Sequence, residues 1–157
     1  MDLDGTLIKV DSMEEALRYL LLRKPLRLLY FLFAKLSMGR PAFKWALYSE
    51  VDLGPLPYNE ELLAWLRAEK SRGRKLLLVS ATPQFYVEKI GRRLGDLFDE
   101  IIGSTPSENR KSKKKARELV RRFGDKGFDY VGNSTADVAV WKAADIGYNV
   151  NLTVAIK

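Results

Sequence analysis

The hydrophobic and polar positions along the chain change their spacing repeatedly, and these changes divide it into alternating strands and helices. Short unbroken apolar runs, such as residues 76–79, are typical of strands buried on both faces of a parallel sheet. We predict strands over 75–80, 98–103, 128–131 and 146–150. Helix caps and apolar faces between these runs predict helices over 59–72, 82–95, 109–123 and 134–144. This alternation predicts an α/β fold with three layers, a parallel sheet and right-handed crossovers.

Residues 12–50 interrupt the alternation and contain only helical patterns. Ser12 followed by Glu15 has the spacing of a capping box, and Pro25 separates the first helix from the second. Three helices are predicted there, over 12–24, 26–37 and 41–50. We interpret 12–50 as a helical cap inserted into one domain that spans residues 1–157.

The composition limits the chemistry that the chain can use. It contains no cysteine and no histidine, which excludes disulfides, cysteine nucleophiles, imidazole bases and nearly every zinc site. Catalysis must therefore use Asp, Glu, Lys, Ser or Thr. The net charge of +7 favours an anionic partner, which can be a phosphorylated substrate, an acidic membrane surface or nucleic acid. Nucleic acid is the least favoured of the three, since no known nucleic-acid-binding motif is present.

Two carboxylates stand close together at the beginning of the chain, in Asp2 and Asp4. In an extended segment the side chains at i and i+2 point the same way, and Gly5 allows the backbone to turn behind them. Carboxylate oxygens suit Mg²⁺. Two alternatives are an ordinary Asp-Gly turn and part of a calcium loop, although the bidentate Glu of such a loop is missing. We predict a functional site that includes both carboxylates.

Polar residues also follow the strand predicted over 75–80 and begin the basic helix. Ser80 ends that strand, and Ala81 follows it at the predicted start of a helix, where a hydroxyl and backbone amides can bind an anion. Lys111 lies near the predicted start of the basic helix, and Lys115 is the alternative in the same run of lysines. These groups suit the oxygen atoms of a phosphate.

Asn133 and Asp137 follow the strand predicted over 128–131. An amide oxygen and a carboxylate at this edge of the sheet can support a metal ion. The alternative is structural, because Ser134 and Asp137 have the spacing of a helix capping box. Taken with the carboxylates and the lysine, the pattern predicts a phosphate-and-magnesium site beyond the carboxyl ends of the strands.

The order and spacing of these motifs resemble the haloacid dehalogenase (HAD) superfamily of phosphatases over essentially the whole chain. More narrowly, residues 56–66 and 128–134 are similar to HAD-like domains fused ahead of UbiA-type membrane prenyltransferases in bacteria. The resemblance implies a Rossmann-like core with a cap, and hydrolysis of a small phosphomonoester through an aspartyl phosphate. Its association with prenyltransferases suggests a prenyl or sugar-lipid phosphate as the substrate.

The resemblance also implies a role for each motif. Asp2 matches the nucleophile, and Asp4 matches the general acid and base. Ser80, with the neighbouring Ala81, matches the phosphate-binding position. Lys111 matches the lysine that stabilises the nucleophile and the phosphoryl charge.

The metal ligands implied for Mg²⁺ are Asp2, Asp4, Asn133 and Asp137. Asn133 departs from the family pattern, which has an acidic residue there, so we expect weaker Mg²⁺ binding and reduced activity. Only Met1 precedes Asp2 in this sequence. We therefore expect either a very short central strand or a truncated start.

These departures support a second hypothesis, a catalytically weak partner domain of a membrane prenyltransferase or of the membrane surface. The aromatic residues of the cap are expected to form its own core. With the basic residues among them, they also suit an amphipathic surface on anionic lipid. No signal peptide is recognisable and no apolar run is long enough to span a bilayer. We expect a cytoplasmic protein, peripheral to the inner membrane.

Overall fold

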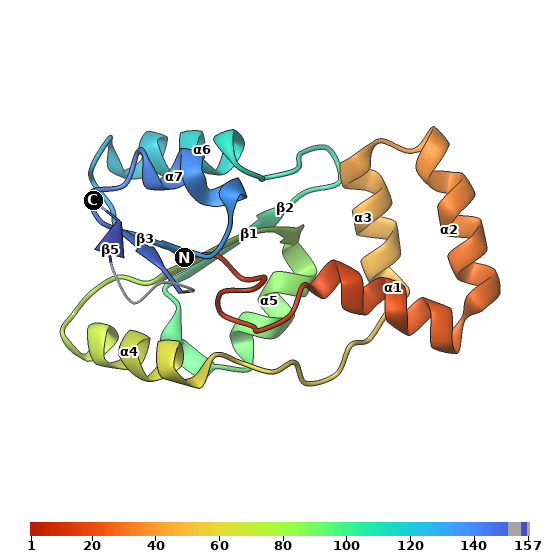
Figure 1. Cartoon of the computed structure of the whole chain (residues 1–157), viewed down its shortest axis with the longest axis horizontal. Coiled ribbons are helices and arrows are strands. Elements are labelled where there is room, and N and C mark those ends of the chain that lie inside the picture. The colour runs from red at the N-terminus through yellow and green to blue at the C-terminus, as the bar shows by residue number, and fades with distance from the viewer. Residues whose placement is uncertain (151–154, 157) are drawn as a thin grey trace.

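The computed structural model describes residues 1–150, 155 and 156, and it confirms the predicted α/β class. A parallel sheet lies between two layers of helices, and three further helices project from one end as a separate cap (Figure 1). The cap helices are α1 (Ser12–Arg23), α2 (Pro25–Ser37) and α3 (Arg40–Ser49). Their bounds are close to the predicted ones.

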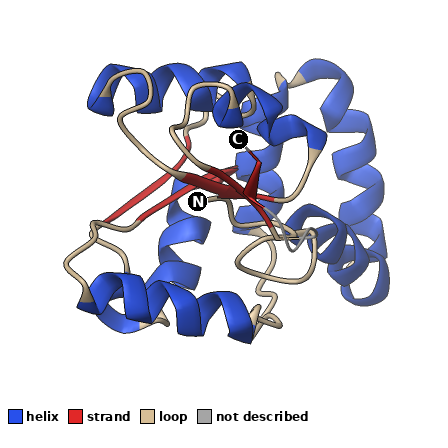
Figure 2. Ribbon diagram, turned by 60° about the vertical axis from the view of Figure 1, so that its left-hand side comes forward, coloured by secondary structure: helices blue, strands red, loops and turns tan. Residues whose placement is uncertain are grey.

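The core contains helices on both faces of its strands (Figure 2). In chain order its elements are α4 (Glu60–Ser71), β1 (Leu77–Pro83), α5 (Gln84–Arg92), β2 (Glu100–Ser104), α6 (Lys113–Phe123), β3 (Tyr130–Gly132), α7 (Val138–Trp141), β4 (Gly147–Asn149) and β5 (Ala155–Ile156). Short 3₁₀ turns stand at Gly95–Leu97 and Thr135–Asp137. Helices α4 and α5 form the layer on one face of the sheet, and α6 and α7 form the layer on the other (Figures 1 and 2).

The strands form two groups with the predicted parallel pairing. In one group β1 pairs with β2, and Leu78 lies opposite Ile101. In the other group β3 pairs with β4, and Val131 lies opposite Tyr148. β5, which the sequence pattern did not predict, pairs with β4 in the antiparallel direction.

The first two residues join these two groups of strands. Met1 donates its nitrogen hydrogen to the carbonyl of Leu77 at 2.8 Å and accepts from the amide of Val79 at 2.9 Å. On the other side, the amide of Asp2 donates to the carbonyl of Val131 at 2.9 Å. Met1 and Asp2 therefore occupy the position of a central strand between β1 and β3.

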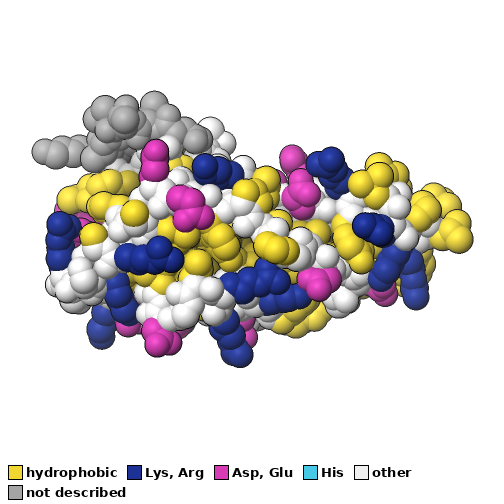
Figure 3. All heavy atoms as spheres, turned by 90° about the horizontal axis from the view of Figure 1, so that it is seen from below, with side chains coloured by type: hydrophobic (Ala, Val, Ile, Leu, Met, Phe, Trp, Pro, Cys, Tyr) yellow, Lys and Arg dark blue, Asp and Glu magenta, His cyan; other side chains and the backbone are white. Residues whose placement is uncertain are grey.

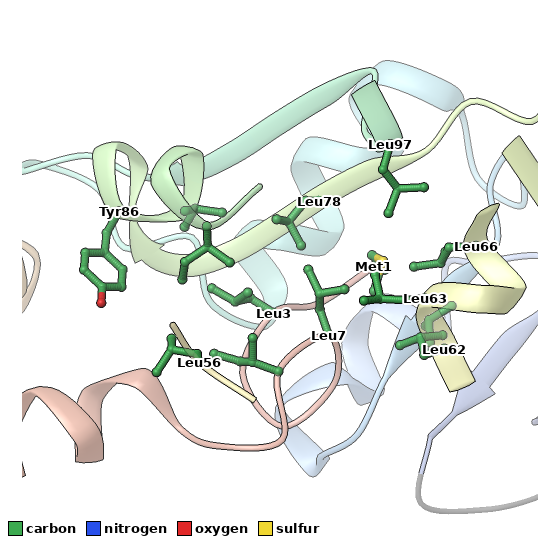
Figure 4. Close-up of a cluster of buried hydrophobic side chains, with 14 of the residues drawn as sticks. Met1, Leu3, Leu7, Leu56, Leu62, Leu63, Leu66, Leu78, Tyr86 and Leu97 are labelled. Atoms are coloured by element: carbon green, nitrogen blue, oxygen red, sulfur yellow. The ribbon is translucent and has the colours of Figure 1, made fainter. Parts of the chain in front are cut away.

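The hydrophobic core has one cluster on each side of the sheet and a third inside the cap. Leu78 belongs to the cluster beneath the sheet, together with Leu3, Leu7 and residues of α4 (Figure 4). The next residue, Val79, belongs to the cluster under α6 and α7. Because side chains alternate along a strand, an unbroken apolar run fills both clusters at once. The third cluster packs α1, α2 and α3 against one another.

Several predicted helix starts are wrong. The helix predicted from residue 82 begins at Gln84, because β1 continues in extended conformation through Pro83. The helix predicted from Asn109 begins at Lys113, since Ser112 has a positive φ of 51° that interrupts any helix. The helix predicted over 134–144 is reduced to a 3₁₀ turn and the short α7.

The N-terminus of α1 also differs from the predicted capping box. Asp11 is the N-cap, and its carboxylate accepts hydrogen bonds from the amides of Met13 and Glu14. Ser12 is fully buried, with its hydroxyl 2.8 Å from that of Tyr48 in α3. The cap thus begins at a residue that is tied to the interior of the protein.

Candidate active site

A pocket of about 330 Å³ lies between the carboxyl ends of the strands and the cap. Side chains of both the core and the cap line it, and most of them are polar or charged. All seven site residues predicted from the sequence are among its lining: Asp2, Asp4, Ser80, Ala81, Lys111, Asn133 and Asp137. The fold therefore brings together residues that are up to 135 positions apart in the sequence.

The lysine in contact with Asp2 is Lys115 and not Lys111. Its ammonium nitrogen lies 2.6 Å from Oδ1 of Asp2, and its side chain is 4% exposed. Because α6 begins at Lys113, four residues later than predicted, Lys115 lies in its first turn and points into the protein. Lys111 lies before the helix, where it is exposed and lines the pocket.

A chain of buried polar contacts continues from Lys115 to Asp137. Lys115 donates to the hydroxyl of Tyr130 at 2.8 Å, and this hydroxyl donates to Oδ1 of Asp137 at 2.9 Å. Burial raises the pKa of Tyr130 well above its usual value, so the hydroxyl keeps its proton. Asp2, Lys115, Tyr130 and Asp137 thus form one connected network in the interior.

The other oxygen of Asp137 closes a turn of the backbone. Oδ2 accepts from the amides of Asn133 at 3.2 Å and Ser134 at 3.3 Å, and the capping box that the sequence offered as an alternative is present. Both carboxylate oxygens of Asp137 are therefore engaged by the protein. Its role as a metal ligand stays a prediction.

The charges of this network favour a cation beside Asp2. Burial raises the pKa of the Asp2 carboxyl, and the ammonium of Lys115 acts in the opposite direction. Lys115 also lies 3.7 Å from Asp137. One ammonium faces two carboxylates, so ionised Asp2 and Asp137 leave a net negative charge at the bottom of the pocket. A second cation would stabilise the ionised form of Asp2.

Asp4 is held by groups from the cap and from the core. Its Oδ1 accepts from the amide of Ser12 at 2.8 Å, and its Oδ2 accepts from the hydroxyl of Thr82 at 2.9 Å. The hydroxyls of Ser12 and Thr82 are themselves 3.3 Å apart. Burial raises the pKa of Tyr48, which keeps the hydroxyl next to Ser12 protonated. The orientation of the Asp4 carboxylate is thus fixed from two sides.

Gly5 is required by the turn that separates these two carboxylates from the cap. Its φ is +66°, a conformation that glycine adopts without strain. A Cβ atom at this position would lie 2.1 Å from Nδ2 of Asn133. The side chain of Asn133 is therefore packed against the turn, beside the two aspartates.

The residues predicted to bind phosphate, Ser80 and Ala81, lie within β1, just before its last two residues. Ser80 is fully buried and its hydroxyl accepts from the amide of Thr82 at 3.1 Å. The carbonyl of Ala81 accepts from Lys44 at 2.6 Å and from Ser104 at 2.9 Å. Since β1 continues past these residues, the expected helix N-terminus is not formed here, and an anion would meet the end of a strand.

Two cations of the cap, Arg40 and Lys44, line the same pocket, and no sequence pattern indicated this position. Burial lowers the pKa of Lys44, and the charges of Arg40 and Lys111 lower it further, while Asp4 and Asp11 oppose them. Lys44 therefore interacts electrostatically with charged groups of both the cap and the core. No signal in the sequence could have placed α3 over the strand ends.

The predicted metal site is sparse in acidic groups. The described residues contain no cluster of three or more His, Cys, Asp or Glu side chains arranged to hold a metal ion. Asp4 and Asp137 direct their oxygens to protein donors, as described above. The remaining oxygen-bearing side chains of the lining that lie beside Asp4 and suit Mg²⁺ are the Asp2 carboxylate and the Asn133 amide. This set fits a hard cation, with fewer charges than a fully acidic site.

Comparison with known proteins identifies relatives of the chain. Over 145 residues it is 41% identical to the uncharacterized protein y4nM of Sinorhizobium fredii, and the match covers 91% of this chain. The same match covers only 28% of that longer relative.

Two solved structures share the fold at low sequence identity. A protein of unknown function from Bordetella pertussis Tohama I has a TM-score of 0.64 at 15% identity, covering 97% of this chain and 88% of that one. A HAD family hydrolase from Salmonella enterica subsp. enterica serovar Typhi has a TM-score of 0.61 at 14% identity, covering 91% and 58%. These similarities confirm the Rossmann-like fold.

The sequence profile of haloacid dehalogenase-like hydrolases matches residues 1–142, which includes all seven predicted site residues. HAD hydrolases generally use Mg²⁺, in keeping with the oxygen donors of the pocket. The chain belongs to the haloacid dehalogenase-like hydrolase family.

Proposed function

We propose that the chain is a Mg²⁺-dependent phosphomonoester hydrolase that acts through an aspartyl phosphate on Asp2. The observation that carries the proposal is the contact of 2.6 Å between Asp2 and the buried Lys115, in a pocket that also contains Asp4. A carboxylate held beside an ammonium is restrained in position and its negative charge is partly balanced. Both features suit attack on an anionic phosphoryl group.

The proposed reaction has two steps. A carboxylate oxygen of Asp2 forms a bond to phosphorus while the bond from phosphorus to the leaving oxygen breaks, and Asp4 gives that oxygen a proton. Asp4 then takes a proton from water, whose oxygen attacks phosphorus and releases Asp2. Transfer of these protons by a positioned carboxyl group contributes about 10²–10⁴-fold to the rate. Asp4 is positioned for this role by its hydrogen bonds from Ser12 and Thr82.

The phosphoryl oxygens would be held from several directions. Lys115 supplies positive charge next to Asp2, and Ser80, whose hydroxyl would bind a phosphoryl oxygen, lines the same pocket from within β1. Asp2, the Asn133 amide oxygen and the backbone near Asp4 would hold Mg²⁺, which supplies further charge stabilisation for the phosphoryl group. Because Asn133 carries no charge, we expect weaker Mg²⁺ binding than with an acidic residue.

The cations around the mouth of the pocket bear on the substrate. Arg40, Lys44 and Lys111 line the pocket; Lys44 donates to the carbonyl of Ala81, and the charges of the other two act on Lys44. They would favour a leaving group that carries negative charge of its own. A small phosphorylated molecule with a second anionic group fits this lining. A prenyl or sugar-lipid phosphate, the class suggested by the resemblance to prenyltransferase-associated domains, is the substrate class to test alongside it.

The decisive assay measures phosphate release from an aryl phosphate with Mg²⁺. We expect Asp2→Asn to abolish the reaction, because the amide is isosteric but is not a nucleophile. Asp125→Asn is the matched control, since Asp125 is exposed and outside the pocket. Equal rates for the wild type and Asp2→Asn would remove the proposal.

A second function is supported by the sparse metal site. With Asn133 in place of an acid and no cluster of three acidic groups among the described side chains, the chain can instead be a catalytically weak domain. In that case it would act as the cytoplasmic partner of a UbiA-type membrane prenyltransferase or of the membrane surface. Thermal shift distinguishes the two functions. Stabilisation by Mg²⁺ with beryllofluoride, which mimics a phosphoryl group on Asp2, supports the enzyme, and no shift supports the partner domain.

A further inference from the structure

The cap exposes an apolar surface that the proposed catalytic function does not use. Of the described large hydrophobic side chains that are exposed, most lie between residues 21 and 33, and Leu26 is 83% exposed. We define the cap patch as Leu21, Leu22, Leu26, Leu29, Tyr30, Leu32 and Phe33. Isolated exposed apolar residues are ordinary, whereas a contiguous group of this kind marks an interaction surface.

The cap patch exists because α2 is apolar on both of its faces. Phe31 is buried and packs in the cap cluster between α1 and α3. Leu26, Leu29, Tyr30 and Phe33 have the spacing i, i+3, i+4 and i+7, which places them on one side of the helix. The expectation that Tyr30 and Phe33 belong to the cap's own core is wrong, because they are 58% and 66% exposed.

The patch lies away from the pocket. α2 contacts α1 and α3, and α3 in turn contacts β1, so α3 separates α2 from the core (Figure 1). A space-filling view shows hydrophobic side chains gathered at the cap end of the molecule, with Lys and Arg among them (Figure 3). A surface that bound to the patch would therefore leave the pocket accessible.

The charge around the patch selects the class of partner. Residues 12–40 contain six Lys or Arg and two Asp or Glu. Arg18 and Arg27 are 71% and 59% exposed, although each has a guanidinium nitrogen 3.9 Å from a carboxylate oxygen, that of Glu15 and that of Glu50 respectively. Exposed apolar side chains with basic residues beside them match the interfacial region of an anionic bilayer, where the phosphates lie next to the hydrocarbon.

We propose that the cap patch binds the surface of an anionic lipid bilayer, with α2 lying in the plane of the interface. Leu26 and Phe33 would enter the boundary between headgroups and acyl chains, while Arg18 and Arg27 would contact the phosphates. No helix in the described part of the chain is long and apolar enough to cross the bilayer, so the contact would be peripheral. This proposal does not depend on hydrolase activity; it extends the second function proposed above by naming the surface that would contact the membrane.

Vesicle co-sedimentation tests the proposal with the 157-residue chain. We expect binding to vesicles of phosphatidylglycerol and phosphatidylcholine, little binding to phosphatidylcholine alone, and weaker binding in high salt. The double variant Leu26→Ser/Phe33→Ser should lose the binding. Its matched control is Phe123→Ser/Val138→Ser, which changes two exposed hydrophobics outside the cap and should bind as the wild type does. Circular dichroism confirms that each variant is folded.

Three results would overturn the proposal. The first is the absence of binding to the anionic vesicles. The second is equal binding by the wild type and Leu26→Ser/Phe33→Ser. The third is self-association of the wild type without vesicle binding, measured by analytical ultracentrifugation at several concentrations and abolished in the double variant. This result would assign the patch to a second copy of the chain. Reduced vesicle binding by Arg18→Gln/Arg27→Gln would support the electrostatic part of the proposal, and unchanged binding would overturn that part.

Discussion

Replacement of Lys115 by Met tests the buried network on which the site depends. Met has a similar length and helix propensity, so α6 should be retained. The change removes the ammonium from between Asp2 and Asp137 and leaves the Tyr130 hydroxyl without its donor. Removing one partner of a buried ion pair costs about 3–5 kcal/mol, because the remaining charge is uncompensated. This is a large part of the roughly 5–15 kcal/mol that stabilises a typical domain.

The loss should appear in both thermal and chemical unfolding. For a domain of this size each 1 kcal/mol corresponds to about 2–4 °C, so we expect Lys115→Met to lower the melting temperature by roughly 6–20 °C. The loss should also depend on pH. Burial already raises the pKa of Asp2, and without Lys115 the folded state binds a proton there more readily. The stability deficit should therefore shrink as the pH falls from neutral towards acidic values.

The control variants are on the same segment of chain. Lys114→Met changes an exposed lysine one position earlier, and Lys111→Met changes the lysine predicted from the sequence. Each should alter the unfolding free energy, measured in urea, by no more than about 0.5 kcal/mol. The double variant Asp2→Asn/Lys115→Met should regain part of the loss, since it removes one of the two carboxylates that Lys115→Met leaves without a counterion. If Lys115→Met is no more destabilising than Lys114→Met, the reasoning about the buried pair is refuted.

Three further predictions concern the turn, the cap and the surface. Gly5→Ala should lower the free energy of unfolding in urea more than Gly95→Ala does. Both glycines have a positive φ, which costs an alanine about 1–2 kcal/mol, but of the two only a methyl group at Gly5 would meet a side chain within 4 Å. Equal losses would contradict the packing of Asn133 against Gly5. Lys44→Met should raise KM for a doubly anionic phosphoester more than for an aryl phosphate, with Lys35→Met as the control for the cap. Hydrogen bonds from two arginines of α6 lower the pKa of Glu118 from 4.5 to about 2, so the stability it contributes is present above pH 4.5 and is lost as the pH falls towards 2. The difference in melting temperature between the wild type and Glu118→Gln should shrink over that range.

Much of the fold could be predicted because the local sequence patterns agree with where the residues lie in the folded protein. The apolar run at the start of β1 indicated a strand buried on both faces, and Leu78 and Val79 do belong to opposite clusters. Asp2, Asp4 and Ser80 were identified because each stands at or just beyond the expected end of a strand, and parallel strands end at one edge of the sheet, although β1 itself continues to Pro83. Their meeting in one pocket required only the correct sheet topology.

The details that could not be predicted depend on distant contacts. Lys111 and Lys115 stand in one run of lysines, and the sequence around them does not show which one is buried. The choice is made by the positive φ of Ser112, which sets the start of α6, and by Asp2, which is 113 residues from Lys115. Lys44 could not be identified because the orientation of the cap over the strand ends depends on packing between helices.

Ser12 connects the cap to the core, and this connection bears on how the proposed site would work. Its amide holds the carboxylate of Asp4, and its hydroxyl lies beside those of Tyr48 in α3 and Thr82 in β1. Because Ser12 is also the first residue of α1, a swing of the cap away from the core would pull on the group that orients Asp4, the proposed acid and base. In the proposed mechanism, opening for substrate exchange and readiness for proton transfer would then exclude each other. Water entering an open pocket would meet an Asp4 that is out of position, and an aspartyl phosphate on Asp2 would persist until the cap had closed again.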